Sequence, residues 1–75
     1  MAAAEIEALI RRALPDAEVE IEALVDDGDH YRARVVSASF VGKNRVQQHK
    51  LVYDALGGRM GGELHALQLV TAVPN

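Results

Sequence analysis

The sequence predicts an α+β domain in which helices cover one face of a three-stranded sheet. Three observations support this fold class. Apolar residues recur at helical spacing near the N-terminus, two segments within residues 17–37 alternate apolar with charged side chains, and a second helical stretch precedes an apolar strand near the C-terminus. The predicted order is helix, strand, strand, helix, strand.

The first helix is predicted over residues 2–14. Its apolar residues follow the 3.6-residue period, with charged side chains between them: Ile6, Leu9, Ile10, Ala13 and Leu14. Pro15 ends this helix, because a residue that precedes proline is pushed out of the α region.

Residues 17–24 and 30–37 are predicted to form a hairpin around a turn at Asp26–Asp29. Glutamates occupy the polar face of the first strand, and arginines occupy that of the second: Glu18, Glu20, Glu22, Arg32 and Arg34. Opposite charges then face each other across the strands, and each such pair contributes roughly 0.2–1 kcal/mol. Helices must cover the other face, so only one face of the sheet meets water.

The second helix is predicted to start after Asn44, a suitable N-cap, and to end at Gly57 and Gly58. Phe40–Asn44 is predicted to be a loop or single turn, in which Gly42 has a structural role. One helix face is apolar except for a histidine, and its residues are Val46, His49, Val52, Tyr53 and Leu56. We interpret His49 and Tyr53 as structural residues of this face. Residues 58–62 are predicted to form a loop before a third strand over 63–73.

The chain has 75 residues, which we assign to one domain, 1–75. It contains no cysteine, so disulfides and all-cysteine metal sites are excluded. No apolar run approaches the roughly 20 residues of a membrane span, and the N-terminal segment lacks the basic start of a targeting peptide. We therefore expect a cytoplasmic protein that does not act at a membrane.

Charge is distributed unevenly along the chain. Residues 1–30 carry a net charge of −7, whereas residues 31–62 carry +5, within a total of −3. Lys43, Arg45 and Lys50 belong to this basic middle and are candidates for binding nucleic acid or a protein partner. A solvated face that binds nothing is the commoner explanation of such a region.

The three histidines are the remaining residues whose side chains could bind a metal. No nucleophile, zinc-protease or phosphate-loop motif is present, so we expect no enzymatic activity. Taken alone, His30 is an exposed residue at a strand start, and His65 is more often a hydrogen-bonded structural residue than a ligand. Imidazole is nevertheless the commonest nitrogen ligand of metals, so a metal role for His30 and His65 stays open.

Several motifs together resemble the BolA family. They are a strand ending in Val35-Val36-Ser37, a turn that contains Phe40, the pattern G-x-x-x-V-x-x-H-x-x-V-Y-x-x-L over residues 42–56, and His65-Ala66-Leu67 in the last strand. The resemblance implies a class II KH-like α-β-β-α-β fold. Many members continue into a further C-terminal helix, and some carry a loop cysteine; this chain matches neither feature, which puts contacts made through them in doubt.

The resemblance also implies a partnership with monothiol glutaredoxins through a shared [2Fe–2S] cluster. The glutaredoxin cysteine and glutathione supply the thiolates, and the BolA-like protein supplies a histidine from its last strand, which matches His65. A second ligand comes from the loop between the first two strands, where His30 is the only imidazole. We expect no cofactor in the isolated chain, which should be a monomer or a weak homodimer.

Nucleic-acid binding is the alternative function. KH-like folds bind single strands through a GxxG loop with basic flanks, and some BolA-like proteins are transcription regulators. The corresponding segment here contains Gly42, Lys43, Arg45 and Lys50. An isoelectric point of about 5.5 and the lack of an aromatic stacking platform argue against this alternative.

Overall fold

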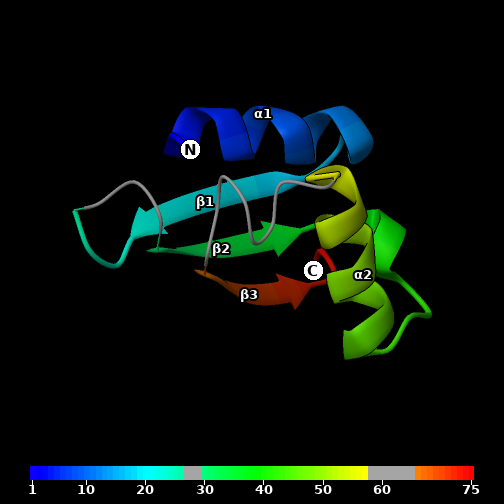
Figure 1. The fold of residues 1–75 in the computed structure, drawn as a ribbon. Helices are drawn as coiled ribbons and strands as arrows, with labels where there is room; N and C mark the ends of the chain where they lie inside the picture. Colours follow the sequence, from blue (N-terminus) through cyan, green and yellow to red (C-terminus); the bar gives the residue numbers. More distant parts are fainter. Residues whose placement is uncertain (27–29, 58–65) are drawn as a thin grey trace.

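The computed structural model describes residues 1–26, 30–57 and 66–75. Its elements are α1 (Ala3–Ala13), β1 (Glu18–Ala23), β2 (His30–Val36), the 3-10 helix η1 (Ala38–Phe40), α2 (Arg45–Ala55) and β3 (Ala66–Ala72) (Figure 1). β2 is the central strand, pairing antiparallel with β1 and parallel with β3. The predicted α+β class and element order are therefore confirmed. The predicted turn at 27–29, the loop after Gly57 and the first residues of the third strand lie outside the described residues.

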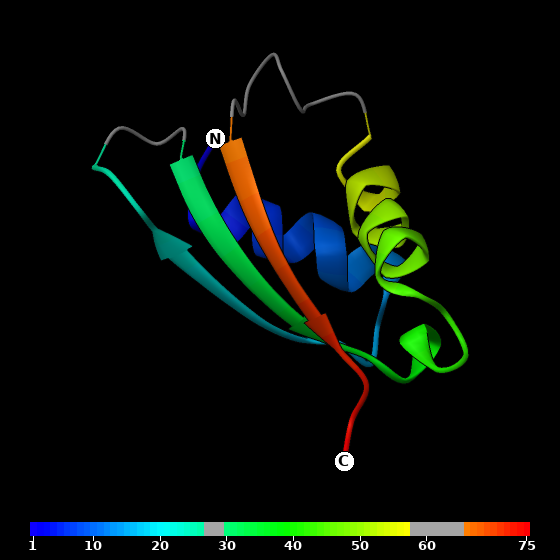
Figure 2. The ribbon, with the colours of Figure 1, turned by 90° about the horizontal axis from the view of Figure 1, so that it is seen from below.

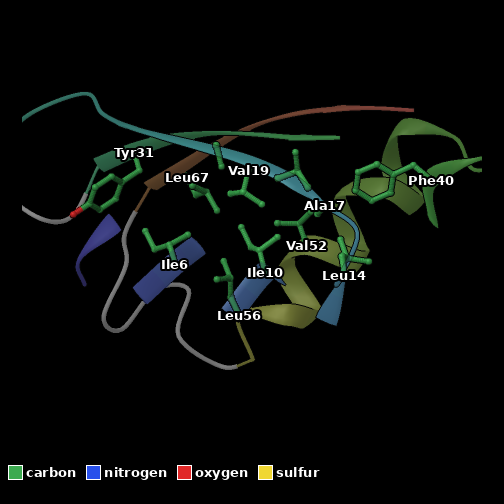
Figure 3. Close-up of a cluster of buried hydrophobic side chains, with 12 residues drawn as sticks. Ile6, Ile10, Leu14, Ala17, Val19, Tyr31, Phe40, Val52, Leu56 and Leu67 are labelled. Atoms are coloured by element: carbon green, nitrogen blue, oxygen red, sulfur yellow. The ribbon is translucent and has the colours of Figure 1, made fainter. Parts of the chain in front are cut away.

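The hydrophobic core lies between the sheet and the two helices, which share one face of the sheet (Figure 3). Ile6 and Ile10 of α1 and Val52 of α2 are completely buried. Their partners from the sheet include Val35 and Leu67. Each fully buried aliphatic side chain contributes about 1.5–3 kcal/mol relative to exposure, so this layer holds the helices on the sheet.

α1 ends at Ala13, as Pro15 predicts, and its buried stripe contains Ile6 and Ile10. Leu14 follows the helix and is also buried, whereas Ala13, which shares the predicted apolar period, is exposed. The phenol Oη of Tyr31 donates a 2.7 Å hydrogen bond to the backbone oxygen of Met1. The start of the chain is thereby fixed to the start of β2.

The hairpin places glutamates opposite arginines, as the sequence predicts. Glu20 pairs with Arg34 and Glu22 pairs with Arg32. The Arg34 Nη1 to Glu20 Oε1 distance is 3.9 Å, and the Arg32 Nη1 to Glu22 Oε2 distance is 3.8 Å. All four side chains are largely exposed, so these pairs set the register more than they stabilise the fold. The face of the sheet that carries them is the open face.

The Asp16 carboxylate fixes the connection between β2 and η1. Its Oδ1 accepts a 2.8 Å hydrogen bond from the Ser37 hydroxyl, and its Oδ2 accepts one of 2.8 Å from the Ala38 backbone N–H. The Ser37 oxygen in turn accepts from the Ser39 backbone N–H, which begins the helical turn. Because Ser37 is completely buried, it depends on these partners for hydrogen bonding.

Replacing Asp16 with asparagine is expected to lower stability at neutral pH but much less in strong acid. The backbone N–H of Ala38 and the hydroxyl of Ser37 lower the pKa of Asp16 below its ordinary value of 3.8. The charged carboxylate therefore stabilises the fold above that value, and this contribution is lost as the pH falls through the lower pKa of the folded state. Melting temperatures of both proteins, measured from about pH 7 down to about pH 2.5, should converge in acid. A constant difference would contradict this account.

α2 begins and ends at the residues that the sequence indicates. The Asn44 side chain accepts from the Gln47 backbone N–H at 2.9 Å, and the Gln47 side chain accepts from the Asn44 backbone N–H at 3.0 Å, forming a capping box. Gly42 before the helix and Gly57 after it have positive φ angles of 79° and 64°. Glycine adopts this region without the steric cost that a side chain brings, so both turns depend on glycine.

Candidate functional site

His30 occupies the first position of β2, beside the first residue of β3. It pairs in register with Ala66, and its backbone oxygen accepts a 2.9 Å hydrogen bond from the Leu24 N–H. The next residue, Tyr31, is buried in the core. Because side chains alternate along a strand, the half-buried His30 lies on the open face of the sheet with Arg32 and Arg34.

His65, the other predicted ligand, lies outside the described residues. It precedes Ala66 in the sequence, and Ala66 is the register partner of His30. The sequence predicts that His65 shares a side with Leu67 and Leu69, and the structure places these leucines against the core. That prediction would put the two imidazoles on different faces of the sheet, so it favours His65 and His30 in unequal roles.

The described residues can contribute a ligand but not a complete metal shell. Among them, no group of three histidine, cysteine, aspartate or glutamate residues is arranged to hold a metal ion. The whole sequence lacks cysteine, the usual ligand of iron–sulfur clusters. A metal group bound at His30 would therefore need ligands from outside the described residues.

His49 lies in the middle of α2 and is half-buried. Its Nε2 atom is buried and has no hydrogen-bond partner in the part of the chain that the structure describes. An unsatisfied buried nitrogen of this kind costs about 1–3 kcal/mol. Burial also closes this nitrogen to an outside molecule, so we assign His49 no role as a ligand.

The apolar face of α2 is shorter than the sequence predicts. Val52 and Leu56 are buried, but Val46 is 78% exposed and Tyr53 is 38% exposed. Val46, which the sequence assigns to the apolar face, is therefore not part of the core, and Tyr53 contributes less to the core than a fully buried residue would. Only the C-terminal half of α2 packs on the core.

Gln48 fixes the first half of α2, although no sequence motif marks this residue. Its Nε2 donates to the backbone oxygen of Lys43 at 2.9 Å and to that of Phe40 at 3.4 Å. Its Oε1 accepts a 2.6 Å hydrogen bond from the hydroxyl of Thr71 in β3. One amide thus joins the loop before α2 to the sheet. No local pattern marks a residue whose partners are this distant in sequence.

The candidate basic residues fall into two groups. Lys43 and Arg45 are exposed at the start of α2, and neither forms an ion pair with any residue that the structure describes. Lys50 instead lies 2.9 Å from the Asp54 carboxylate, in an i,i+4 pair along the helix. Part of its charge is therefore already balanced, and Lys43 and Arg45 carry most of the available positive charge.

The structure separates these basic residues from His30. β2 starts at His30 and runs toward the end of the sheet where η1 and α2 follow (Figure 1). A seven-residue strand spans about 20 Å. The predicted metal-ligand region and the predicted nucleic-acid region therefore lie at opposite ends of the domain and can be altered independently.

No described helix has the length and apolar character needed to cross a membrane.

The chain is similar to known proteins along most of its length. The family model described as BolA-like protein matches residues 10–75. A Rickettsia prowazekii protein is 34% identical over 71 residues, which are 95% of this chain and 92% of that protein. The structure of a BolA protein homologue from Coxiella burnetii superimposes with a TM-score of 0.83 at 35% identity, covering 99% of this chain and 92% of the other. BolA1 from Arabidopsis thaliana gives 0.83 at 33% identity, covering 96% and 90%.

Some relatives are much longer than this chain. The SufE-like protein 1 of Arabidopsis thaliana, a chloroplastic and mitochondrial protein, is 44% identical over 50 residues, which are 65% of this chain and 14% of that protein. The similarity to this relative concerns one part of its length, and the structure of the BolA domain of SufE1 from Arabidopsis thaliana matches this fold with a TM-score of 0.83 at 32% identity, covering 95% of this chain and 90% of the other.

Proposed function

The chain belongs to the BolA-like protein family, and we propose that it is a partner of monothiol glutaredoxins with which it shares a [2Fe–2S] cluster. The glutaredoxin cysteine and glutathione supply thiolates, and this chain supplies imidazole nitrogen from His65, with His30 as a secondary ligand. Its role is to modulate iron–sulfur cluster trafficking or iron and redox regulation in the cytoplasm. We assign it no catalytic activity.

The position of His30 is the observation that supports this proposal most. His30 opens β2 opposite Ala66, the residue that follows His65 in the sequence. The two histidines that the family resemblance selects are 35 positions apart in the sequence. Ala66, the residue that follows His65, starts β3 at the same end of the sheet as His30. The lack of cysteine fits a protein that completes a cluster instead of holding one alone.

Imidazole ligation has chemical consequences for such a cluster. A neutral imidazole in place of a thiolate removes negative charge from the iron and raises the reduction potential, as in Rieske centres. Ligation also becomes sensitive to acid, because a protonated imidazole cannot bind a metal. Both effects suit a protein that changes a delivery cluster into a regulatory or storage form.

The test is to mix the chain with a cluster-loaded monothiol glutaredoxin under anaerobic conditions. We expect the two proteins to elute together and the visible circular dichroism of the cluster to change, because one iron acquires a new ligand. Unchanged spectra and separate elution at about 100 μM of each protein, well above a typical specific Kd, would exclude the proposal.

Nucleic-acid binding is the second candidate function, and the exposed pair Lys43 and Arg45 favours it. Lys43 precedes the N-cap Asn44 and Arg45 is the first residue of α2, where the helix dipole also attracts an anion. Single-stranded nucleic acid is the ligand that a KH-like loop with basic flanks would select.

Reversing the charge of both residues, Lys43→Glu with Arg45→Glu, is expected to weaken any such binding at least about tenfold and to reduce its dependence on salt. Lys50→Glu is the control, since the Asp54 carboxylate already balances this lysine, and it should have a clearly smaller effect. Fluorescence anisotropy of a labelled single-stranded oligonucleotide measures both quantities. Equal losses in the two variants would show that net charge, and not the start of α2, controls binding.

A further inference from the structure

β3 forms one edge of the sheet and carries no protection against pairing with another strand. The sequence from Ala66 to Ala72 contains no charged residue and no proline. β1, the other edge, carries Glu18, Glu20 and Glu22 on its exposed face. Natural edge strands usually avoid association through charge, proline or short length. β1 follows this rule, and β3, with seven residues, does not.

The hydrogen bonds with β2 determine which backbone groups of β3 point outward. The Ser37 N–H donates to the Ala72 oxygen at 3.1 Å, so the backbone groups of Ala72 face β2. In a parallel ladder, alternate residues direct their N–H and C=O groups to opposite sides. Leu67, Leu69 and Thr71 therefore direct theirs away from β2, and no residue within the described ranges pairs with them.

Among the described elements, none covers the outer edge of β3. Figure 2 views the molecule from the β3 side, and no described element crosses in front of this strand. On the open face of the sheet, Val70 of β3 is 48% exposed. The strand thus offers unpaired backbone groups next to an exposed apolar side chain. Such an edge strand can pair with a further strand.

We propose that β3 pairs with β3 of a second copy of this chain, in antiparallel orientation about a two-fold axis. Self-pairing fits the composition of the edge, because strands without charge place no like charges opposite each other. The two three-stranded sheets would then join into one continuous sheet, with both β3 strands at its centre. A two-fold interface closes on itself and gives a dimer, not a fibre.

The position of α2 selects the antiparallel orientation. The Gln48 to Thr71 hydrogen bond places α2 over the carboxyl end of β3. Antiparallel pairing puts the α2 helices of the two copies at opposite ends of the strand pair, where they do not compete for space. A register centred on Leu69 sets Leu69 against its own counterpart and Leu67 against Thr71. Each of these residues directs its backbone groups outward.

The dimer should be weak. A seven-residue strand pair with few side-chain contacts buries less than about 1,200 Å², the lower limit for stable association. Dissociation constants in the range of about 0.1–1 mM are the expectation for such a contact. The test therefore needs concentrated protein, and it uses the chain alone, without glutaredoxin or a cluster, so that its outcome does not depend on the function proposed above.

Sedimentation equilibrium tests the proposal with two matched variants. The mass of the wild-type chain is expected to rise from 8.1 kDa toward twice this value as concentration approaches about 1 mM. Val70→Lys places a charge on the exposed face of β3 and should keep the protein monomeric. Val25→Lys makes the same change two positions after β1, at the other edge, where the side chain is 56% exposed. This control should dimerise like the wild type.

Dilution of isotope-labelled protein, followed by NMR, locates the contact. Amide shifts that change with concentration should cluster at residues 67–71, and added salt should not weaken the association, because no charge takes part in it. A constant mass of 8.1 kDa throughout, equal dimerisation of Val70→Lys and wild type, or concentration-dependent shifts centred on α2 would each overturn the proposal.

Discussion

Replacing His65 with alanine is expected to remove the cluster spectrum of the glutaredoxin complex while leaving the fold intact. If the imidazole completes the coordination of one iron, its loss leaves an open position that this cysteine-free chain cannot fill. Loss of an outer-shell partner of a metal ligand already reduces affinity about 10–100-fold, so loss of a ligand should reduce complex formation by at least that factor. Visible circular dichroism and anaerobic size-exclusion chromatography measure the two effects.

His30→Ala is the internal comparison, and its effect should be smaller. The structure places His30 on the open face of the sheet, whereas the sequence predicts that His65 lies on the side of the core. If His65→Ala removes the cluster spectrum and His30→Ala leaves it unchanged, this chain supplies a single ligand to the cluster. A larger loss from His30→Ala than from His65→Ala would reverse the assignment of the two roles.

His65→Cys separates ligation from a purely structural role of the histidine. A thiolate can replace imidazole on iron, so this variant should recover the complex with a shifted spectrum and a lower reduction potential. If the histidine only supports the fold, His65→Cys should not restore the complex with a shifted visible spectrum. Far-ultraviolet circular dichroism of each variant, measured without glutaredoxin, shows whether the domain remains folded. Persistence of the wild-type spectrum in His65→Ala would end the cluster-ligand interpretation.

The hairpin could be predicted in detail because its signals are local. Alternation of glutamate with apolar residues, and then of arginine with apolar residues, defines both strands and their faces. The charges predicted that glutamates face arginines, and the structure pairs Glu20 with Arg34 and Glu22 with Arg32. The capping box at Asn44 is equally local, since its partner Gln47 is three positions away.

The features that the sequence did not predict depend on contacts between distant residues. Asp16 binds Ser37 and Ala38, more than 20 positions later, and Gln48 binds Thr71 at a similar separation. Neither pair belongs to a repeating pattern. The exposure of Val46 has the same origin, because the period of α2 defines a face but not how much of that face the sheet reaches.

The candidate site shows the same limit. The residue types of His30, Lys43 and Arg45 suggested their chemistry, but their separation depends on the direction and length of β2. The order of the strands was not predicted either, and it is the parallel pairing of β3 with β2 that brings Ala66 beside His30. The sequence could therefore suggest candidate functions for these residues, whereas their positions relative to one another required the fold.

Replacing Phe40 with alanine is expected to destabilise the domain by about 3–5 kcal/mol, the range for removal of a buried aromatic ring. Phe40 is the only phenylalanine of the chain and is completely buried. A domain of this size has a free energy of unfolding of about 4–11 kcal/mol. This single change should therefore remove a large share of that stability. Urea denaturation followed by circular dichroism measures the loss.

Val41→Ala is the matched control, because it truncates the next residue, whose side chain is mostly exposed, and it should change stability by less than about 0.5 kcal/mol. Phe40 also lies where three features meet: η1, the backbone oxygen that accepts from Gln48, and the loop that leads to Lys43 and Arg45. Phe40→Leu should restore most of the stability, because it refills much of the cavity. If Phe40→Ala instead unfolds at nearly the same urea concentration as Val41→Ala, the ring does not support the connection between the sheet and α2. Gln48 and the capping box alone would then fix the position of Lys43 and Arg45.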